Sequence, residues 1–389
     1  MSSPVPTEPA SETITSEIVE RVRKPMQQFV RGWMMSPATL ERRASFGLDP
    51  AMTPGGTSVG DAVPRAGMVP PASLLPDVLP TERLNRRAMA QPPLRAELRR
   101  IRNGRSALAV VCLAAQVVLI FAGAIWLAHP LGYVVAFVLL GRVMVCCNIL
   151  GHEAVHRTLF SNQRVNDWVG RWLLSYPALV AFELYRRGHM AHHRDEMGPA
   201  EPDLALYRGY PITRASLRRK LVRDASGVSG WKILKDLLRG LGKARSRPVA
   251  AKIVAVQVLM VAVATLFGRP ELYLLWLGPY LTQWRVANRL RAIAEHGGMI
   301  RSADRRETTH LVRQGPLARF FMVPYHVGLH LAHHVDMGVP CWNLPRLQRE
   351  LEASGWVPSA LIYPSYRSLW SKLSSRAPSA APVAAGVEV

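Results

Sequence analysis

The residues best suited to chemistry in this sequence are its histidines, because eight of the twelve fall into three tight groups. In the first, residues 152–156 (HEAVH), a four-residue spacing puts both imidazoles on one face of a helix, where they can share a metal. The second, residues 189–193 (HMAHH), and the third, residues 330–334 (HLAHH), repeat one H-x-x-H-H spacing. Because imidazole is the commonest metal ligand in proteins, the three groups predict a metal site.

The first group taken alone leaves several alternatives open. It matches H-E-x-x-H, in which two histidines bind zinc and Glu153 would be the general base of a metalloprotease. A structural histidine pair and another kind of metal site are the competing interpretations. Eight imidazoles exceed the capacity of one tetrahedral zinc, so we infer two metals, each bound by about four or five nitrogens. That number disfavours a protease, which needs three protein ligands.

Four histidines lie outside these groups. His296 ends the helix that continues from the last apolar segment, and we expect it to be a ninth ligand, the alternative being a capping or solvated histidine. His326 lies one helical turn before His330 and is expected to support a ligand rather than to be one. His129, in a turn, and His310, in a charged stretch, are expected to be unrelated to the site.

Apolar segments must position these groups. Hydrophobic residues make up 49% of the chain and charged ones 20%, and long uncharged runs predict membrane spans. We expect four spans in two hairpins, over residues 107–128, 131–150, 253–267 and 272–284. Residues 171–183 are apolar but too short to span, and are expected to be interfacial or re-entrant. The fold class is therefore predicted to be all-α, a polytopic helix bundle with a cytoplasmic helical cap that carries the histidines.

The charge pattern predicts which side of the membrane the histidines face. The formal net charge is +22, and five arginines precede the first span, which places the N-terminus in the cytoplasm. Residues 208–252 carry thirteen Lys or Arg against two Asp, a pattern typical of a cytoplasmic loop beside anionic lipid. An even number of crossings between the groups then puts all of them, and both termini, in the cytoplasm. Nucleic-acid binding is disfavoured because this loop lacks interleaved aromatics.

The two ends of the chain differ in composition from the middle. Fourteen of the thirty prolines precede residue 94, so residues 1–100 are predicted to be a disordered tail, within which residues 14–35 could form an amphipathic helix. Residues 101–370 are expected to form the membrane domain, and residues 371–389 a second disordered tail. No cleaved signal peptide is predicted after the first methionine.

With its three histidine groups, in order and alternating with paired spans, the sequence resembles the membrane fatty acid desaturase family. The likeness extends to Glu201-Pro202-Asp203-Leu204 after the second group, and to residues 339–345 (VPCWNLP) after the third. It implies two non-haem irons as cofactors and dioxygen as co-substrate. The ligands that it implies are His152, His156, His189, His192, His193, His296, His330, His333 and His334. Ala292 departs from the pattern, because animal acyl-CoA desaturases have asparagine there, and Asn288 stands one turn further back.

The resemblance implies an oxidoreductase that introduces a double bond into a fatty acyl chain delivered on CoA, a lipid or a carrier. Electrons would come from an external donor, a ferredoxin, cytochrome b5 or flavin reductase, because the sequence has no dinucleotide fingerprint and no ferredoxin-type cysteine spacing. A hydroxylase or ketolase of the same superfamily is the near alternative. An intramembrane zinc protease and a non-catalytic metal-binding protein are further alternatives. Carboxylates expected to orient the imidazoles, or else to be solvated at the surface, are Glu153, Asp195, Glu196, Glu201, Asp203, Glu295 and Asp336.

Overall fold

The computed structural model describes residues 67–199 and 201–376. This part of the chain is mostly helical, as predicted, with one short parallel pair of strands, β1 (Leu311–Val312) and β2 (Ile362–Tyr363). The long helices are α4 (Asn103–Leu127), α5 (Pro130–Val155), α11 (Arg247–Leu266), α12 (Leu272–Leu281) and α13 (Gln283–His296). The other α-helices are α3 (Leu94–Leu98), α6 (Gln163–Val169), α7 (Phe182–Arg194), α8 (Leu204–Tyr207), α9 (Arg214–Ala225), α10 (Val228–Arg239), α14 (Arg305–Thr308), α15 (Pro316–Phe321), α16 (His330–Val335), α17 (Leu344–Ala353) and α18 (Tyr366–Leu373). Single turns are η1 (Ala72–Leu74), the π-helical η2 (Gly170–Ser175), η3 (Gly240–Gly242), η4 (Pro324–His326), η5 (Cys341–Asn343) and η6 (Ser359–Leu361).

Three helical stretches of the described chain are long and apolar enough to cross a membrane: residues 94–127, which contain α4, then α5 and α11. They correspond to three of the four predicted spans. The fourth differs, because the backbone leaves the helical region at Thr282 (φ −118°, ψ −82°) and divides the predicted segment between α12 and α13. Helix α12 has ten residues, about 15 Å at the usual rise, which is half of a bilayer core. Four spans and a cytoplasmic cap therefore remain predictions.

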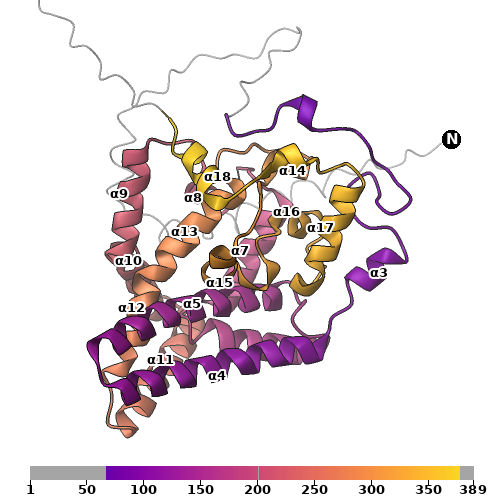
Figure 1. Cartoon of the computed structure of the whole chain (residues 1–389). Helices are drawn as coiled ribbons and strands as arrows, with labels where there is room; N and C mark the ends of the chain where they lie inside the picture. The colour runs from indigo at the N-terminus through magenta and orange to yellow at the C-terminus, as the bar shows by residue number, and fades with distance from the viewer. Residues whose placement is uncertain (1–66, 200, 377–389) are drawn as a thin grey trace, which may run out of the picture.

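Helices α4 and α5 run antiparallel along one side of the molecule (Figure 1). On α4, large apolar side chains such as Leu108 and Leu119 are exposed, as expected of a helix that faces lipid. In contrast, Leu140 and Met144 of α5 are fully buried, because α5 packs against α4, α12, α13 and η2. The start of α13 approaches α5 closely at Gly141, where a Cβ atom would lie 2.1 Å from the side chain of Gln283. Helix α5 is thus the central element, and its C-terminal end carries the first histidine group.

Arg142 is a charge within the α5 span and has partners inside the protein. It donates a hydrogen bond to the side-chain oxygen of Gln116 on α4, and its guanidinium carbon lies 4.4 Å from the ring centroid of Phe320 on α15. These contacts offset part of the cost of placing an arginine in an apolar segment.

The N-terminal part differs from the prediction of a disordered tail over residues 67–100. There Leu84 and Leu98 are buried in a second hydrophobic core together with residues of α16 and α17. Arg99 forms an ion pair with Asp336 at 2.7 Å, just beyond α16. The composition gave a wrong prediction here because the core that buries these apolar residues includes α16 and α17, which are distant in the sequence. Residues 14–35 and 377–389 lie outside the described residues, and the predicted boundary at residue 370 falls within α18.

The predicted interfacial segment begins in the structure as η2, a π-helical continuation of α6. Trp168, Trp172 and Leu173 are exposed along it, as the side chains of an interfacial segment would be. Gly170 allows it to lie against α5, since a Cβ atom there would be 2.6 Å from that of Ala154.

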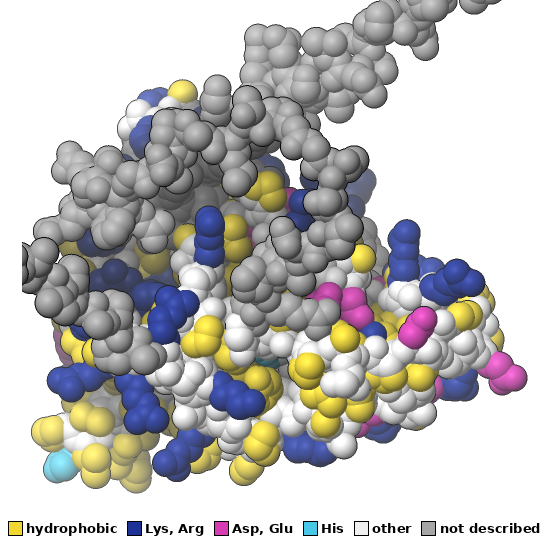
Figure 2. All heavy atoms as spheres, turned by 90° about the horizontal axis from the view of Figure 1, so that it is seen from above, with side chains coloured by type: hydrophobic (Ala, Val, Ile, Leu, Met, Phe, Trp, Pro, Cys, Tyr) yellow, Lys and Arg dark blue, Asp and Glu magenta, His cyan; other side chains and the backbone are white. Residues whose placement is uncertain are grey.

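Figure 2 shows Lys and Arg side chains spread over one face of the molecule, with Asp and Glu gathered toward one side.

Candidate metal centre

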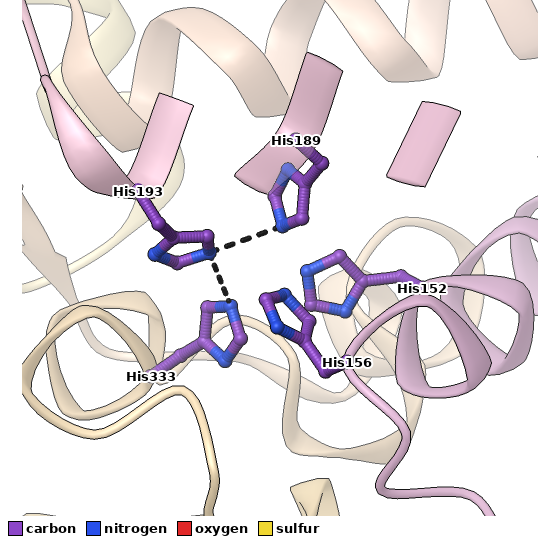
Figure 3. Close-up of side chains that lie close together, drawn as sticks. All are labelled: His152, His156, His189, His193 and His333. Carbon is purple, nitrogen blue, oxygen red and sulfur yellow. Dashed lines mark hydrogen bonds between the residues drawn. The ribbon is translucent and has the colours of Figure 1, made fainter. Parts of the chain in front are cut away.

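Five histidines meet at the end of α5. They come from α5 and the residue that follows it (His152, His156), from α7 (His189, His193) and from α16 (His333), and one ring nitrogen of each lies within 4.8 Å of the others. Figure 3 shows the five rings turned toward one another. The Nε2 atom of His193 is 3.1 Å from those of both His189 and His333. We call this set the five-histidine cluster.

Four more histidines, His192, His296, His330 and His334, form a second buried set within the same distance limit, the four-histidine cluster. Their Nε2 atoms converge: that of His330 lies 2.9 Å from His334 and 3.1 Å from His296. The Nε2 atom of His192 is 3.4 Å from that of His334. The nine histidines that sequence analysis predicted as ligands are the nine in the two clusters.

The repeated H-x-x-H-H spacing explains how two helices serve both clusters. On α7, His189 and His193 point to the five-histidine cluster and His192 to the other; on α16, His333 points to the first and His330 with His334 to the second. Residues four apart share a helical face, whereas the residue between them is turned aside. One helix therefore contributes two imidazoles to one cluster and one to the other, and its counterpart does the reverse.

The four-histidine cluster is held from outside through the Nδ1 atoms of its imidazoles. Glu201 accepts a short hydrogen bond from His192, Glu196 accepts one at 2.5 Å from His334, and the carbonyl of Thr308 accepts one at 2.8 Å from His296. The fourth, His330, has a longer contact of 3.6 Å to a carboxylate oxygen of Glu295. The three hydrogen bonds favour the tautomer in which Nε2 presents its lone pair inward, whereas Nδ1 of His330 has no hydrogen-bond partner in the described chain.

The five-histidine cluster has a single carboxylate contact of this kind in the described chain, 3.6 Å from Nδ1 of His152 to Glu153. The other carboxylate oxygen of Glu153 accepts hydrogen bonds from the hydroxyl of Thr158 and from the backbone N–H of Cys341, both at 2.9 Å. Glu153 thus joins the end of α5 to the loop after α16. This structural role accounts for the glutamate in H-E-x-x-H.

The protonation of most of the clustered imidazoles fits metal binding. Burial lowers the pKa well below its ordinary value because it penalises the charged form, for His189, His193, His296, His330, His333 and His334. For His192 burial has the same effect, but the hydrogen bond and negative charge of Glu201 outweigh it and raise the pKa. Both ring nitrogens of His152 and Nε2 of His156 are buried without a hydrogen-bond partner in the described chain. Buried neutral nitrogens that lack partners are a donor set suited to a divalent transition metal.

Of the three remaining candidate carboxylates, Asp203 lines a cavity beside the histidines and the other two have other partners. Asp195 pairs with Arg301 at 2.6 Å and Asp336 with Arg99, so neither orients an imidazole. Two residues that sequence analysis missed do contact the clusters: Thr308, whose hydroxyl also donates to Glu196 at 2.6 Å, and Tyr207, whose hydroxyl lies 3.3 Å from Nδ1 of His192. No local motif marks either residue, since only the fold brings them to the histidines.

The three remaining histidines lie outside both clusters. His129 accepts a hydrogen bond from the N–H of Leu131 at the start of α5, and Nε2 of His310 donates to the carbonyl of Gly297 at 2.8 Å. His326 belongs to neither cluster, and it makes no hydrogen bond to a clustered histidine among the described residues. The supporting role expected of His326 is therefore not seen as a direct contact.

A cavity of about 190 Å³ adjoins the clusters and is lined by α7, α8, α13 and Asn148 of α5. Four clustered histidines face it: His189, His192, His296 and His330. A second cleft, of about 360 Å³, reaches His330 from the side of β1 and α17, where Arg313 and Gln348 line it. The clusters can thus be approached from two directions.

A model of the fatty acid desaturase family matches residues 124–366, more than half of the chain. The chain belongs to the fatty acid desaturase family. As a member of this family, the protein is an oxidoreductase. The family is membrane-bound, is generally dependent on two irons and acts on fatty acyl substrates with electron donors. The matched region begins near the end of α4 and includes all nine clustered histidines.

Three curated relatives show how broad this family is. The dihydrorhizobitoxine desaturase of Bradyrhizobium elkanii is 24% identical over 258 residues, 58% of this chain and 68% of that protein. The zeaxanthin 4-ketolase of Chlamydomonas reinhardtii is 23% identical over 211 residues, 54% of this chain and 43% of the ketolase. The sn-1 oleoyl-lipid 12-desaturase of Arthrospira platensis is 37% identical over 60 residues, 15% of this chain and 17% of that enzyme.

Proposed function

We propose that this protein is a membrane fatty acyl desaturase that uses dioxygen and two irons, one held by each histidine cluster. The observation that carries the proposal is the division of nine histidines, eight of them buried, into sets of five and four, with four of the nine lining one cavity. When bound, the two irons would supply, with dioxygen, the oxidising power that an unactivated methylene pair requires. In the net reaction two C–H bonds break and a C=C bond forms, and the two hydrogens removed, together with dioxygen, two electrons and two protons, become two molecules of water.

The chain's own residues would bind and protect the reacting carbons. Leu184, Leu206 and Ala292 line the cavity and can contact an acyl chain. Eight of the nine clustered histidines are buried, which would limit the access of water to the place where the methylene groups would lie. Tyr207, which is buried beside His192, can orient that imidazole through its hydroxyl. These residues position the substrate and the ligands rather than taking part in bond breaking.

Electrons would be delivered by an external partner such as a ferredoxin, cytochrome b5 or flavin reductase. We further propose that the protein crosses the membrane several times, with the clusters and both termini in the cytoplasm. The positive charge of residues 208–252 and the three apolar helical stretches support this orientation. Cysteine labelling from either side of the membrane tests it: Arg218→Cys should react from the cytoplasmic side alone.

A hydroxylase or ketolase is the second candidate. Two observations favour it: one relative is a ketolase, and the cavity wall includes polar side chains such as Asn148 and Asn288. The same histidines would serve either reaction. Product mass separates the two, because a desaturase product has lost two hydrogens and a hydroxylated or ketonic product has gained oxygen.

The zinc protease interpretation has little support. Glu153 would have to bind water as a base, but its carboxylate accepts hydrogen bonds from Thr158 and Cys341 and links two elements of the fold. A non-catalytic metal-binding protein would not need a cavity that opens onto four of the ligands.

The proposal is tested by lipid mass spectrometry on cells that express the chain together with a reductase. We expect a new unsaturated acyl species, absent from cells that express His333→Ala. The matched control is His129→Ala, which removes a histidine outside both clusters and should leave the product in place. Unchanged acyl profiles with a functional reductase and iron-loaded protein would contradict the proposal.

A further inference from the structure

Helix α13 carries three arginines that have different partners. Arg289 forms an ion pair with the buried Asp224, and Arg291 forms one with Glu295 at 2.7 Å. Arg285 is 9% exposed, and none of the described carboxylates forms an ion pair with it. Its Nε–H donates to the carbonyl of Tyr280 at 3.1 Å, and its guanidinium carbon lies 4.3 Å from the centroid of the Tyr280 ring. Arg285 is thus the one arginine of this helix that forms no ion pair, and the nearest negative charge acting on it, that of Asp224, is paired with Arg289.

A buried arginine without a counter-charge is costly. Arginine is seldom fully buried unless it is paired, because the charge loses its hydration. The contact with the Tyr280 ring and one carbonyl hydrogen bond offset part of that cost. Since a guanidinium has five N–H donors and one is used by this carbonyl, the group retains capacity for an anion. A direct ion-pair partner could therefore be supplied by a ligand.

Arg285 lies in the wall of the cavity that adjoins the histidines. Arg285, Asn288, Ala292 and His296 follow one another at spacings of three and four residues, so they share a face of α13, and all four line this cavity. His296 comes eleven positions after Arg285, about 16 Å along the helix. The face thus has cationic and amide donors at one end and an imidazole of the four-histidine cluster at the other.

Apolar side chains line the same cavity. Val180, Leu184, Leu206 and Trp284 can contact a carbon chain, and the other charged residues of the wall are Arg187, Asp203 and the ion pair of Arg291 with Glu295. Asn288, one turn from Arg285, makes no hydrogen bond to the described chain and can be a second donor to an anion. A cavity with donors at one end, apolar walls and metal-binding histidines at the other end matches an amphiphilic ligand.

We propose that Arg285 binds an anionic head group of the substrate, a carboxylate or phosphate, inside the cavity, so that the carbon chain lies along α13 toward the histidines. The inference rests on the proposed oxidation of a chain at the clusters and names the class of substrate. Arg285 would then determine specificity. The distance from the bound head group to the histidines sets which carbon is oxidised, and neutral hydrocarbons are poor substrates. Guanidinium pairs with carboxylate and phosphate in a bidentate way, which would fix the register of the chain.

A binding measurement tests this inference without requiring turnover. Purified full-length protein is titrated with dodecanoate, dodecyl phosphate and dodecanol, and binding is followed by ligand-induced thermal stabilisation. We expect at least one of the anionic probes to bind about tenfold more tightly than the alcohol. Preference for dodecanoate would indicate a carboxylate substrate, and preference for dodecyl phosphate a phosphate-bearing lipid.

The variants separate a binding role from a structural one. Arg285→Met should abolish the preference for the anion, and Arg285→Lys should restore part of it. Arg218→Met removes the same charge from an exposed position on α9 and should keep the preference. Equal binding of the three probes by the wild type would overturn the inference, as would an Arg285→Met variant that loses affinity for all three equally. Oxidation of neutral chains with no preference for anions would overturn it while leaving the proposed oxidase function intact.

Discussion

The two histidine clusters lie side by side, yet the protein supports them differently. In the four-histidine cluster, Nδ1 of His192, His296 and His334 each has a hydrogen-bond acceptor. The five-histidine cluster has one more imidazole, but its carboxylate contact is the single 3.6 Å approach of Glu153 to His152. Hydrogen bonds orient the imidazoles of the four-histidine cluster, whereas the five-histidine cluster has more imidazole nitrogens available to a metal. This contrast suggests that the two metals would differ in how tightly they are held and in how each responds to mutation.

The largest difference is expected when a ligand is removed. His330→Ala leaves three imidazoles in the four-histidine cluster, whereas His152→Ala leaves four in the other. We therefore expect His330→Ala to lose about one metal per chain and at least about 100-fold in activity, while His152→Ala retains most of its metal. Metal analysis of the purified variants measures the difference. Equal metal loss in both variants would mean that the clusters do not differ in this respect.

The next prediction concerns the carboxylates that hold the imidazoles. Glu196→Gln keeps the shape of the side chain but removes the charge that accepts the Nδ1–H of His334 and pairs with Arg305 at 2.6 Å. Loss of such a contact typically costs 10- to 100-fold in metal affinity, and we expect a fall of about that size in the four-histidine cluster alone. Chelator competition checks this. The matched control is Asp195→Asn, one residue earlier, which pairs with Arg301 and should leave affinity unchanged.

Glu153 should behave as a structural residue. Glu153→Leu leaves the N–H of Cys341 without its acceptor, and a buried donor without a partner costs about 1–3 kcal/mol of stability. Thermal unfolding measures that loss. Glu153→Gln, which can still accept from Cys341 and Thr158, should retain both stability and oxidation. Complete loss of activity in Glu153→Gln with normal metal content would instead indicate a role in proton transfer.

The smallest effect is expected at the N-terminal segment. Arg99→Gln removes the main ion pair of Asp336, the residue that follows α16. Because Arg99 is partly exposed, we expect a loss of about 1 kcal/mol or less. Since α16 supplies both clusters, metal loss should be slight and equal in the two. Selective loss from one cluster would show that this segment positions one set of ligands.

The histidines could be identified from sequence because a metal site requires a particular residue type at helical spacing. The sequence could not show that His192 belongs to a different cluster from His189 and His193, because this depends on how α7 and α16 face each other. The spans over α4, α5 and α11 were predictable from long apolar runs. The break at Thr282 and the burial of residues 67–100 were not, because tertiary contacts decide both. Similarly, the contact of Thr308 with His296 and the place of Arg285 in the cavity wall depend on the tertiary fold.

Metal content is the most direct test of the central claim that nine histidines hold two irons. Purified full-length protein that has been reconstituted with ferrous iron should contain two irons per chain, as measured by elemental mass spectrometry. Substitution of His330 together with His334 should reduce this to one, and further substitution of His189 with His193 should reduce it to none. A single tightly bound zinc, or an iron content unchanged by these substitutions, would contradict the account.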